Sequence, residues 1–171
     1  MKYRSLMAVL ALFALTACAG TYVPKGEPSM FRSLARPGAE LDAATAASMI
    51  SGYRANSGLP AVTLDPTLMQ MAKTQAEAMA VRDKLSHHVS KPFAVRLKIA
   101  GYDAKRAAEN IAAGYDTLAE AFSGWRASPE HRSNMLLAGA TRMGIAAVYA
   151  PRSKYKVFWS LILAEPDKPR D

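Results

Sequence analysis

Apolar residues recur at helical spacing along the first two thirds of the chain. Within residues 41–55 they lie mostly three or four positions apart and stop before the turn NSGLP, which predicts an amphipathic helix. A short extended piece is expected at residues 61–64. Asp65 and Pro66 then supply an N-cap and a first-turn proline in the right order, so a second helix should start there and end near Asp83. One face of that helix is expected to carry Leu68, Met71, Ala72, Gln75, Ala76 and Met79.

Helical spacing returns later in the chain. Residues 93–100 predict a helix that Gly101 ends, because glycine readily adopts the left-handed conformation of a helix terminus. The segment RAAENIAAGY, residues 106–115, lacks a helical stripe and fits either a strand or a loop. Residues 117–127 predict a further helix, and SPEHRSNMLL begins another directly after it.

The last third of the chain changes character. The runs MGIAAVYA and YKVFWSLIL are rich in β-formers and are separated by a turn around PRSK, which predicts a β-hairpin. Helices first and a strand pair last indicate an α+β domain with helices packed over an antiparallel sheet. Trp125, Phe158 and Trp159 are interpreted as core residues.

The amino terminus has the pattern of an export signal. Lys2 and Arg4 precede an apolar run, residues 6–15, that is too short to cross a bilayer, so residues 1–17 are read as a signal peptide. The letters LTAC resemble the bacterial lipobox, which predicts cleavage before Cys18 and acylation of its sulfur. An ordinary signal peptide with an incidental cysteine is the alternative. Cys18 is the only cysteine, so its acylation would exclude cysteine catalysis.

The remaining residues divide into three parts. The proline-bearing stretch 18–40 is expected to be a lipidated cysteine followed by a flexible tether. Residues 41–165 have the length of one domain, and residues 166–171 form a polar tail. Ala19 follows the anchor, and in the lipoproteins that this pattern resembles, a residue other than Asp there directs the protein to the outer membrane of a Gram-negative cell, on its periplasmic face.

The chain is basic, with 22 Lys and Arg against 14 Asp and Glu and a formal net charge of +8. Much of this excess is dispersed, which fits a solvated basic face. Attraction to anionic envelope lipid or polymer is the alternative interpretation. Nucleic acid is not expected as a partner, since no recognition motif accompanies the charge. A monomer is assumed.

Three segments carry polar residues that a simple core does not need: LSHH at 85–88, AENIAAGY at 108–115, and SPEHRSNML at 128–136. In the last one, Ser128 suits an N-cap, Pro129 the first helical position, and Glu130 the positive end of the helix dipole. His131 has no such local role. Its purpose must therefore lie elsewhere in the fold.

The order of these segments resembles the CAP superfamily of cysteine-rich secretory, antigen 5 and pathogenesis-related domains (SCP-like domains), in its bacterial form. The resemblance covers most of residues 41–164. It rests on YRANSGLPAVTLDPTL, the histidine after Leu85-Ser86, the spacing from RLKIAGY to AEN, Trp125 before SPEHRSNML, and the hairpin with Met143-Gly144-Ile145. The resemblance implies a three-layer α-β-α sandwich with an antiparallel sheet.

The family's cleft usually holds two histidines and two acids. The motifs place His87, Glu109 and His131 in three of these positions. The fourth falls on Ser128, which is a departure from the family. Glu130 and Glu120 are nearby substitutes, although Glu130 and His131, one apart on a helix, should point in different directions.

Other roles for these residues stay open. His88 is an alternative cleft residue to its neighbour His87. Glu109 is alternatively structural, paired with Arg132 or Arg106, while Asn110 caps a turn. His131 is alternatively a partner for buried backbone groups. Arg132 and Asn134 are expected to tie the SPEHRSNML turn to its surroundings.

Two neutral imidazoles that converge in a cleft suit Zn²⁺ or a similar divalent ion. Glu109 would then orient an imidazole, act as a ligand, or serve as a base. The first hypothesis is a non-enzymatic, envelope-anchored module that binds a divalent ion, a lipid or another envelope component. The alternatives are a metal-assisted hydrolase, such as a protease or cell-wall amidase, and a structural envelope protein. A serine triad and a glycosidase acid pair are not supported, because G-x-S-x-G is absent and only one acid is placed.

Overall fold

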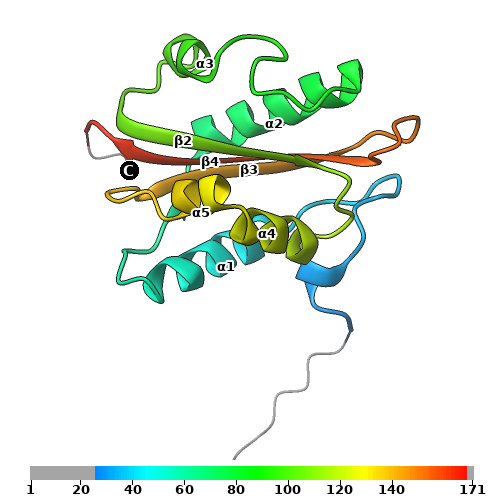
Figure 1. Cartoon of the computed structure of the whole chain (residues 1–171), viewed down its shortest axis with the longest axis horizontal. Helices are drawn as coiled ribbons and strands as arrows, with labels where there is room; N and C mark the ends of the chain where they lie inside the picture. The colour runs from blue at the N-terminus through cyan, green and yellow to red at the C-terminus, as the bar shows by residue number, and fades with distance from the viewer. Residues whose placement is uncertain (1–25, 169–171) are drawn as a thin grey trace, which may run out of the picture.

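The computed structural model describes residues 26–168. The expected signal peptide, Cys18 and Ala19 therefore lie outside the described residues. Within the described part, three layers of secondary structure stack as helices, sheet and helices (Figure 1). The fold class predicted from the sequence is confirmed.

The sheet has four strands in the order β1-β3-β4-β2. β2 (Ala104–Ala113), β3 (Arg142–Tyr149) and β4 (Val157–Pro166) pair antiparallel, and β3 and β4 form the predicted hairpin. β1 (Thr63–Leu64) pairs parallel to β3, so the sheet is mixed and not purely antiparallel. The ambiguous segment RAAENIAAGY is a strand as far as Ala113, and it lies at an edge of the sheet.

One face of the sheet is covered by α2 (Pro66–Arg82) and α3 (Phe93–Ile99). Asp65 caps α2 as predicted, since its side chain accepts a hydrogen bond from the Leu68 backbone N–H over 3.0 Å. The expected stripe is buried in full, with Gln75 among its members. Gly101 follows α3 with a φ of 61°, as a helix terminus requires.

The other face is covered by α1 (Ala43–Ala55), α4 (Leu118–Ala127) and α5 (Pro129–Met135) (Figure 1). The predicted core aromatics lie between these helices and the sheet or in it. Trp125 and Trp159 contact edge to face, with ring centroids 6.4 Å apart, and both are buried. No helix within residues 26–168 is long and apolar enough to cross a membrane.

Residues 28–40 belong to the packed domain and not to a free tether. The short 3₁₀ helix η1 (Ser29–Phe31) is fastened to the start of α1, because the Ser29 hydroxyl donates to Asp42 Oδ2 over 2.8 Å. Leu34 is buried, and its backbone N–H donates to the Asp116 carbonyl over 2.7 Å. Hydrogen bonds from Thr45 and Ser29 lower the pKa of Asp42 to about 2. The domain thus starts near residue 28, where the apolar content was too sparse to predict a packed segment.

Candidate functional site

The edge strand β2 carries neighbouring residues that reach opposite layers of the molecule. Successive side chains of a strand point to opposite faces of the sheet. Glu109 accordingly contacts residues of α3 and of the loop after α2, whereas Asn110 contacts α5. Because β2 is the last strand, residues from both helical layers meet around it.

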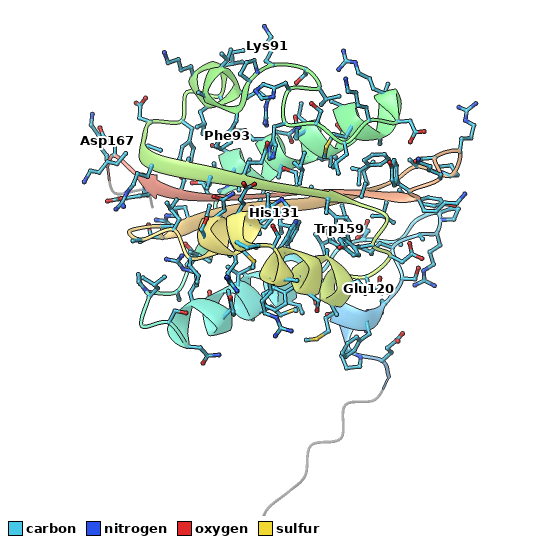
Figure 2. All side chains as sticks on the ribbon, in the orientation of Figure 1. Lys91, Phe93, Glu120, His131, Trp159 and Asp167 are labelled. Atoms are coloured by element: carbon cyan, nitrogen blue, oxygen red, sulfur yellow. The ribbon has the colours of Figure 1, made fainter. Side chains whose placement is uncertain are left out.

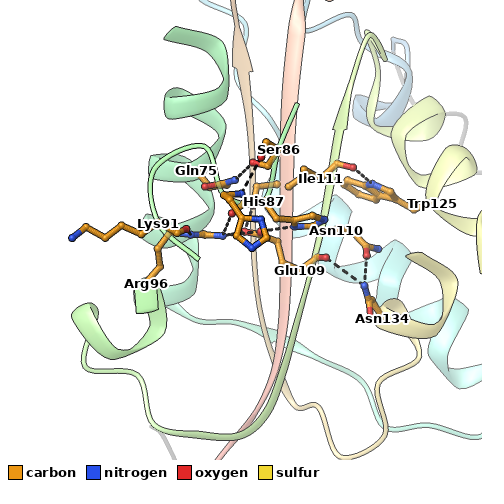
Figure 3. A network of polar contacts seen from close by, with 12 residues as sticks. Gln75, Ser86, His87, Lys91, Arg96, Glu109, Asn110, Ile111, Trp125 and Asn134 are labelled. Atoms are coloured by element: carbon orange, nitrogen blue, oxygen red, sulfur yellow. Dashed lines mark hydrogen bonds and ion pairs between the residues drawn. The ribbon is translucent and has the colours of Figure 1, made fainter. Parts of the chain in front are cut away.

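Glu109 is the centre of a buried polar cluster (Figure 3). It is 5% exposed, and its Oε2 lies 2.8 Å from Nδ1 of His87. Arg96 donates from Nη2 to both carboxylate oxygens, over 2.9 and 2.8 Å, and Ser160 adds a longer hydrogen bond of 3.4 Å to Oε1. An ionised carboxylate only accepts hydrogen bonds, so Nδ1 of His87 carries the proton and Nε2 is left as the basic nitrogen.

A second set of hydrogen bonds attaches α5 to β2. The Asn110 side chain donates to the backbone carbonyl of His131 over 2.9 Å, and Asn134 donates to Asn110 Oδ1 over 2.9 Å and to the Glu109 carbonyl over 3.3 Å. Asn134 therefore ties this turn to its surroundings as predicted. Asn110 does not cap a turn, because it lies within a strand and bridges to the helix.

The two histidines are near enough to influence each other. His131 lies on α5 beside the sheet (Figure 2), and its side chain is half-buried. Burial is the main cause that lowers the pKa of His131, the charge of His87 lowers it further, and Glu130 opposes the shift. His131 is thus held toward its neutral form, which is the form that binds a metal ion.

The structure separates the weaker candidates from this cluster. His88 is exposed, and its backbone N–H contacts the Ser86 hydroxyl. Glu120 lies at the far end of α4 from His131 (Figure 2), where it forms a capping box with Thr117. Glu120 therefore does not replace the fourth cleft acid.

Neither neighbour of Pro129 completes the cluster. Glu130 is exposed, and its carboxylate accepts no hydrogen bond from any of the described residues. Ser128 occupies the N-cap position of α5, but its side chain makes no capping hydrogen bond. At the start of this helix, the Ser128 carbonyl instead accepts a hydrogen bond from the Arg132 backbone N–H over 2.9 Å.

Arg96 is the site residue that the sequence did not reveal. It is 9% exposed and pairs with Glu109, whereas Arg106 pairs with Glu165 over 2.7 Å. The alternative partners Arg106 and Arg132 for Glu109 are therefore wrong. In the sequence, Arg96 is one of many dispersed basic residues. Only its position in a predicted helix, three residues after Phe93, sets it apart from the others.

The imidazoles of His87 and His131 are the candidate metal donors of this site. Among residues 26–168, no group of three His, Cys, Asp or Glu side chains is arranged to hold a metal ion. Glu109 is already engaged by Arg96, so it is better suited to orienting the His87 ring than to binding an ion directly. His87 Nε2 and the imidazole of His131 then remain as candidate donors for an ion.

Comparisons with known proteins agree with this architecture. The model of the CAP family, the cysteine-rich secretory protein family, matches residues 47–163. The chain is 32% identical over 103 residues to the uncharacterized protein YkwD of Bacillus subtilis (strain 168), a match that covers 58% of this chain and 40% of YkwD.

Two solved structures share the fold. An extracellular protein containing an SCP domain from Bacillus anthracis str. Ames superposes with a TM-score of 0.62 at 23% identity, over 71% of this chain and 39% of that protein. An outer surface protein from Borrelia burgdorferi superposes with a TM-score of 0.64 at 19% identity, over 74% of this chain and 93% of that protein. The chain spans about two fifths of YkwD and of the Bacillus anthracis protein, and nearly all of the Borrelia protein.

Proposed function

The chain belongs to the CAP family of cysteine-rich secretory proteins, and we propose that it is a non-enzymatic, envelope-anchored module that binds a divalent ion through His87 and His131. Two solved relatives are described as an extracellular and an outer surface protein, which is consistent with export of this chain. A lipid or another envelope component is the further ligand to test at the same histidines.

The anchor part of the proposal rests on the amino-terminal sequence. The basic start, the short apolar run and LTAC support processing at Cys18, and Ala19 supports retention at the periplasmic face of the outer membrane. Labelling cells with a radioactive fatty acid tests it. We expect label on the protein and none on Cys18→Ala, and an unlabelled wild-type protein would exclude the anchor.

One observation carries the ion-binding part of the proposal. Glu109 holds the Nδ1 side of His87 at 2.8 Å, which leaves Nε2 as the candidate ligand atom, and a second imidazole, that of His131, is near enough for His87 to lower its pKa, which favours the neutral form of His131. Carboxylate-oriented imidazoles of this kind are typical of zinc sites. A bound Zn²⁺ would supply a Lewis-acidic contact for an oxygen atom of a ligand.

The same geometry weighs against the hydrolase hypothesis. A general base has to accept a proton from water or substrate, and its efficiency falls when its negative charge is already compensated. Both oxygens of Glu109 accept hydrogen bonds from Arg96, and the group is buried. Glu109 is therefore better suited to positioning His87 than to proton transfer.

Zinc titration by calorimetry tests the proposal on a chain that starts at residue 19 and so contains every described contact. We expect binding by the wild type and at least a tenfold loss in His87→Ala and in His131→Ala. His88→Ala is the matched control, because it removes the adjacent, exposed imidazole, and it should bind like the wild type. No binding by the folded wild type, or equal losses in all three variants, would refute the two-histidine site.

A further inference from the structure

The sheet is incomplete at the edge opposite β2. β1 pairs with β3 only at Arg142 and Met143, because the chain leaves the sheet at Asp65 to begin α2. β3 continues to Tyr149, and in the part of the chain that the structure describes no other strand lies beside it on this side. Residues 144–149 of β3 therefore form an open edge, with β4 between it and β2.

A groove follows the open edge. One hollow of about 680 Å³ contacts residues 145–148, and a second of about 610 Å³ contacts residues 148–153. Successive residues of a strand face opposite sides of a sheet, so a hollow that contacts four consecutive residues lies along the edge and not over one face. α2 forms one wall of both hollows, and the segment around the start of α1 forms the other wall of the first. The edge is thus recessed, which suits a single extended chain better than the edge of another sheet.

Alternate backbone groups of β3 point into this groove. The Met143 carbonyl accepts from the Asp65 N–H over 2.9 Å, so the odd-numbered residues of β3 direct their N–H and C=O groups away from β4. The Ile145 N–H accordingly lies 3.3 Å from Sδ of Met69, which is a weak acceptor. Ala147 is half-buried, and its N–H and C=O have no hydrogen-bond partner within residues 26–168. The groove therefore lacks partners for a donor and an acceptor of the backbone.

Side chains of the groove add apolar and charged contacts. Val81, on the α2 wall, is 86% exposed although it is apolar, so an occupant that covers it would remove apolar surface from water. Glu40 lines the first hollow and Arg152 the second, and neither has an ion-pair partner among the described residues. The other charged residues of the groove already bind a neighbour: Lys73, Glu77 and Asp83. Opposite charges are thus left free at its two ends.

We infer that this groove binds an extended peptide segment of another protein, which adds a strand to the open edge. A peptide backbone repeats its N–H and C=O groups at the spacing of a strand, so it pairs with Ala147 and offers the Ile145 N–H a carbonyl in place of sulfur. An acyl chain would cover Val81 but would leave both groups of Ala147 without partners. The segment carries mainly uncharged side chains, with a basic residue beside Glu40 and an acidic residue beside Arg152.

A phage-displayed library of random seven-residue peptides tests the inference on the chain that starts at residue 19. We expect enrichment of sequences that have β-branched or apolar residues at alternate positions, a basic residue toward one end and an acidic residue toward the other. An enriched peptide is then synthesised and titrated, and it should bind saturably and shift the backbone amides of residues 145–149. The same peptide with N-methyl groups on every second residue loses its hydrogen bonds along one side, so it should bind at least tenfold more weakly.

Proline at the open edge locates the site. Ala147→Pro removes an N–H that points away from β4, so it should keep the fold and weaken peptide binding at least tenfold. Ala107→Pro is the matched control on β2. The Glu109 carbonyl accepts from the Asn134 side chain, so the odd-numbered residues of β2 also point away from β4, at the opposite edge of the sheet. This control should bind like the wild type.

A second pair of variants tests the α2 wall without a backbone change. Val81→Asp should weaken binding, whereas Val95→Asp should not, because Val95 is 41% exposed on α3 but does not line the groove. Thermal unfolding of each variant establishes that it is folded. If Ala147→Pro fails to fold, the amide shifts of the wild type and the Val81→Asp comparison still decide the outcome.

Several results would overturn the inference. These are no enrichment over the Ala147→Pro protein, equal affinity for the N-methylated peptide, or equal losses in the groove variants and their controls. Sedimentation of the wild type without peptide is the remaining test. Self-association that Ala147→Pro abolishes and Ala107→Pro does not would also overturn it, since the open edge would then be a contact between copies. The zinc experiment does not bear on any of these results, because His87 and His131 do not line the groove.

Discussion

Arg96 on α3 and Glu109 on β2 form an ion pair in which one guanidinium nitrogen, Nη2, lies 2.9 and 2.8 Å from the two carboxylate oxygens. The pair is buried, and it connects one helical layer to the edge strand. Because Glu109 also orients His87, this contact sets the conformation of an imidazole on the loop between the helices.

Breaking this pair should be strongly destabilising. Glu109→Gln leaves the Arg96 charge buried without its counterion, and we expect the free energy of unfolding to fall by about 3–5 kcal/mol. Arg96→Met should have a similar effect. The variant with both substitutions should lose much less than the sum of the two, as urea unfolding of all four proteins would reveal. Additive losses would contradict the direct coupling.

His131 should make stability depend on pH. Its folded-state pKa is lowered, mainly by burial, from an unfolded value of about 6.5. The unfolded chain therefore binds the proton more readily, so this contribution is fully present above about pH 6.5 and is lost as the pH falls through the folded-state pKa. An NMR titration should give His131 a midpoint below its unfolded value of about 6.5. A midpoint at or above about 6.5 would contradict the prediction.

Local signals explain how much of the fold was predictable. Asp65 and Pro66 start a helix because they supply an N-cap and a first-turn proline. The hairpin is predictable because its two strands are neighbouring segments of the chain with the residue pattern of strands. The parallel pairing of Thr63–Leu64 with β3 was not predictable, because it joins residues far apart in the sequence. The docking of residues 28–40 was missed for a similar reason, since Leu34 is its one buried hydrophobic residue and Met30, Ala35 and Ala39 are only partly buried.

The site was predictable only where motifs carried it. The motifs named His87, Glu109 and His131; His87 contacts Glu109 directly, and the backbone carbonyl of His131 accepts a hydrogen bond from Asn110, the next residue along β2. Arg96 was missed because its partner lies 13 residues away on another element. Glu120 was considered as a substitute acid because it is near in sequence, but its carboxylate is used in a local capping box.

Arg54 should be among the side chains that the fold tolerates least well when replaced. It is fully buried, and its guanidinium donates to the carbonyls of Pro60, Met135, Leu137 and Ala140 over 2.8–3.0 Å. Arg54→Lys keeps the charge but not the planar fork. We expect it to lower the free energy of unfolding by about 2–4 kcal/mol, because buried carbonyls lose their donors.

Chemical denaturation of Arg54→Lys beside Arg36→Lys checks this expectation. Arg36 is exposed, so its replacement should change stability by less than about 0.5 kcal/mol. Equal stability of the two variants would show that the charge of Arg54, and not its fork of hydrogen bonds, is what the fold requires.

Gly144 allows α2 to lie directly against β3. A methyl group at this position would overlap the backbone of α2 at the Leu68 carbonyl and the Met69 nitrogen. Backbone atoms cannot rotate away as a side chain can, so Gly144→Ala must push the helix from the sheet, and we expect the free energy of unfolding to fall by about 1–3 kcal/mol.

Gly52→Ala is the matched control, because Gly52 lies within α1 with open space around it. Alanine is the better helix former, so this control should be stabilised by up to about 1 kcal/mol. Opposite signs for the same added methyl group would identify close approach of α2 and β3 as the cause, whereas an unchanged Gly144→Ala protein would refute it.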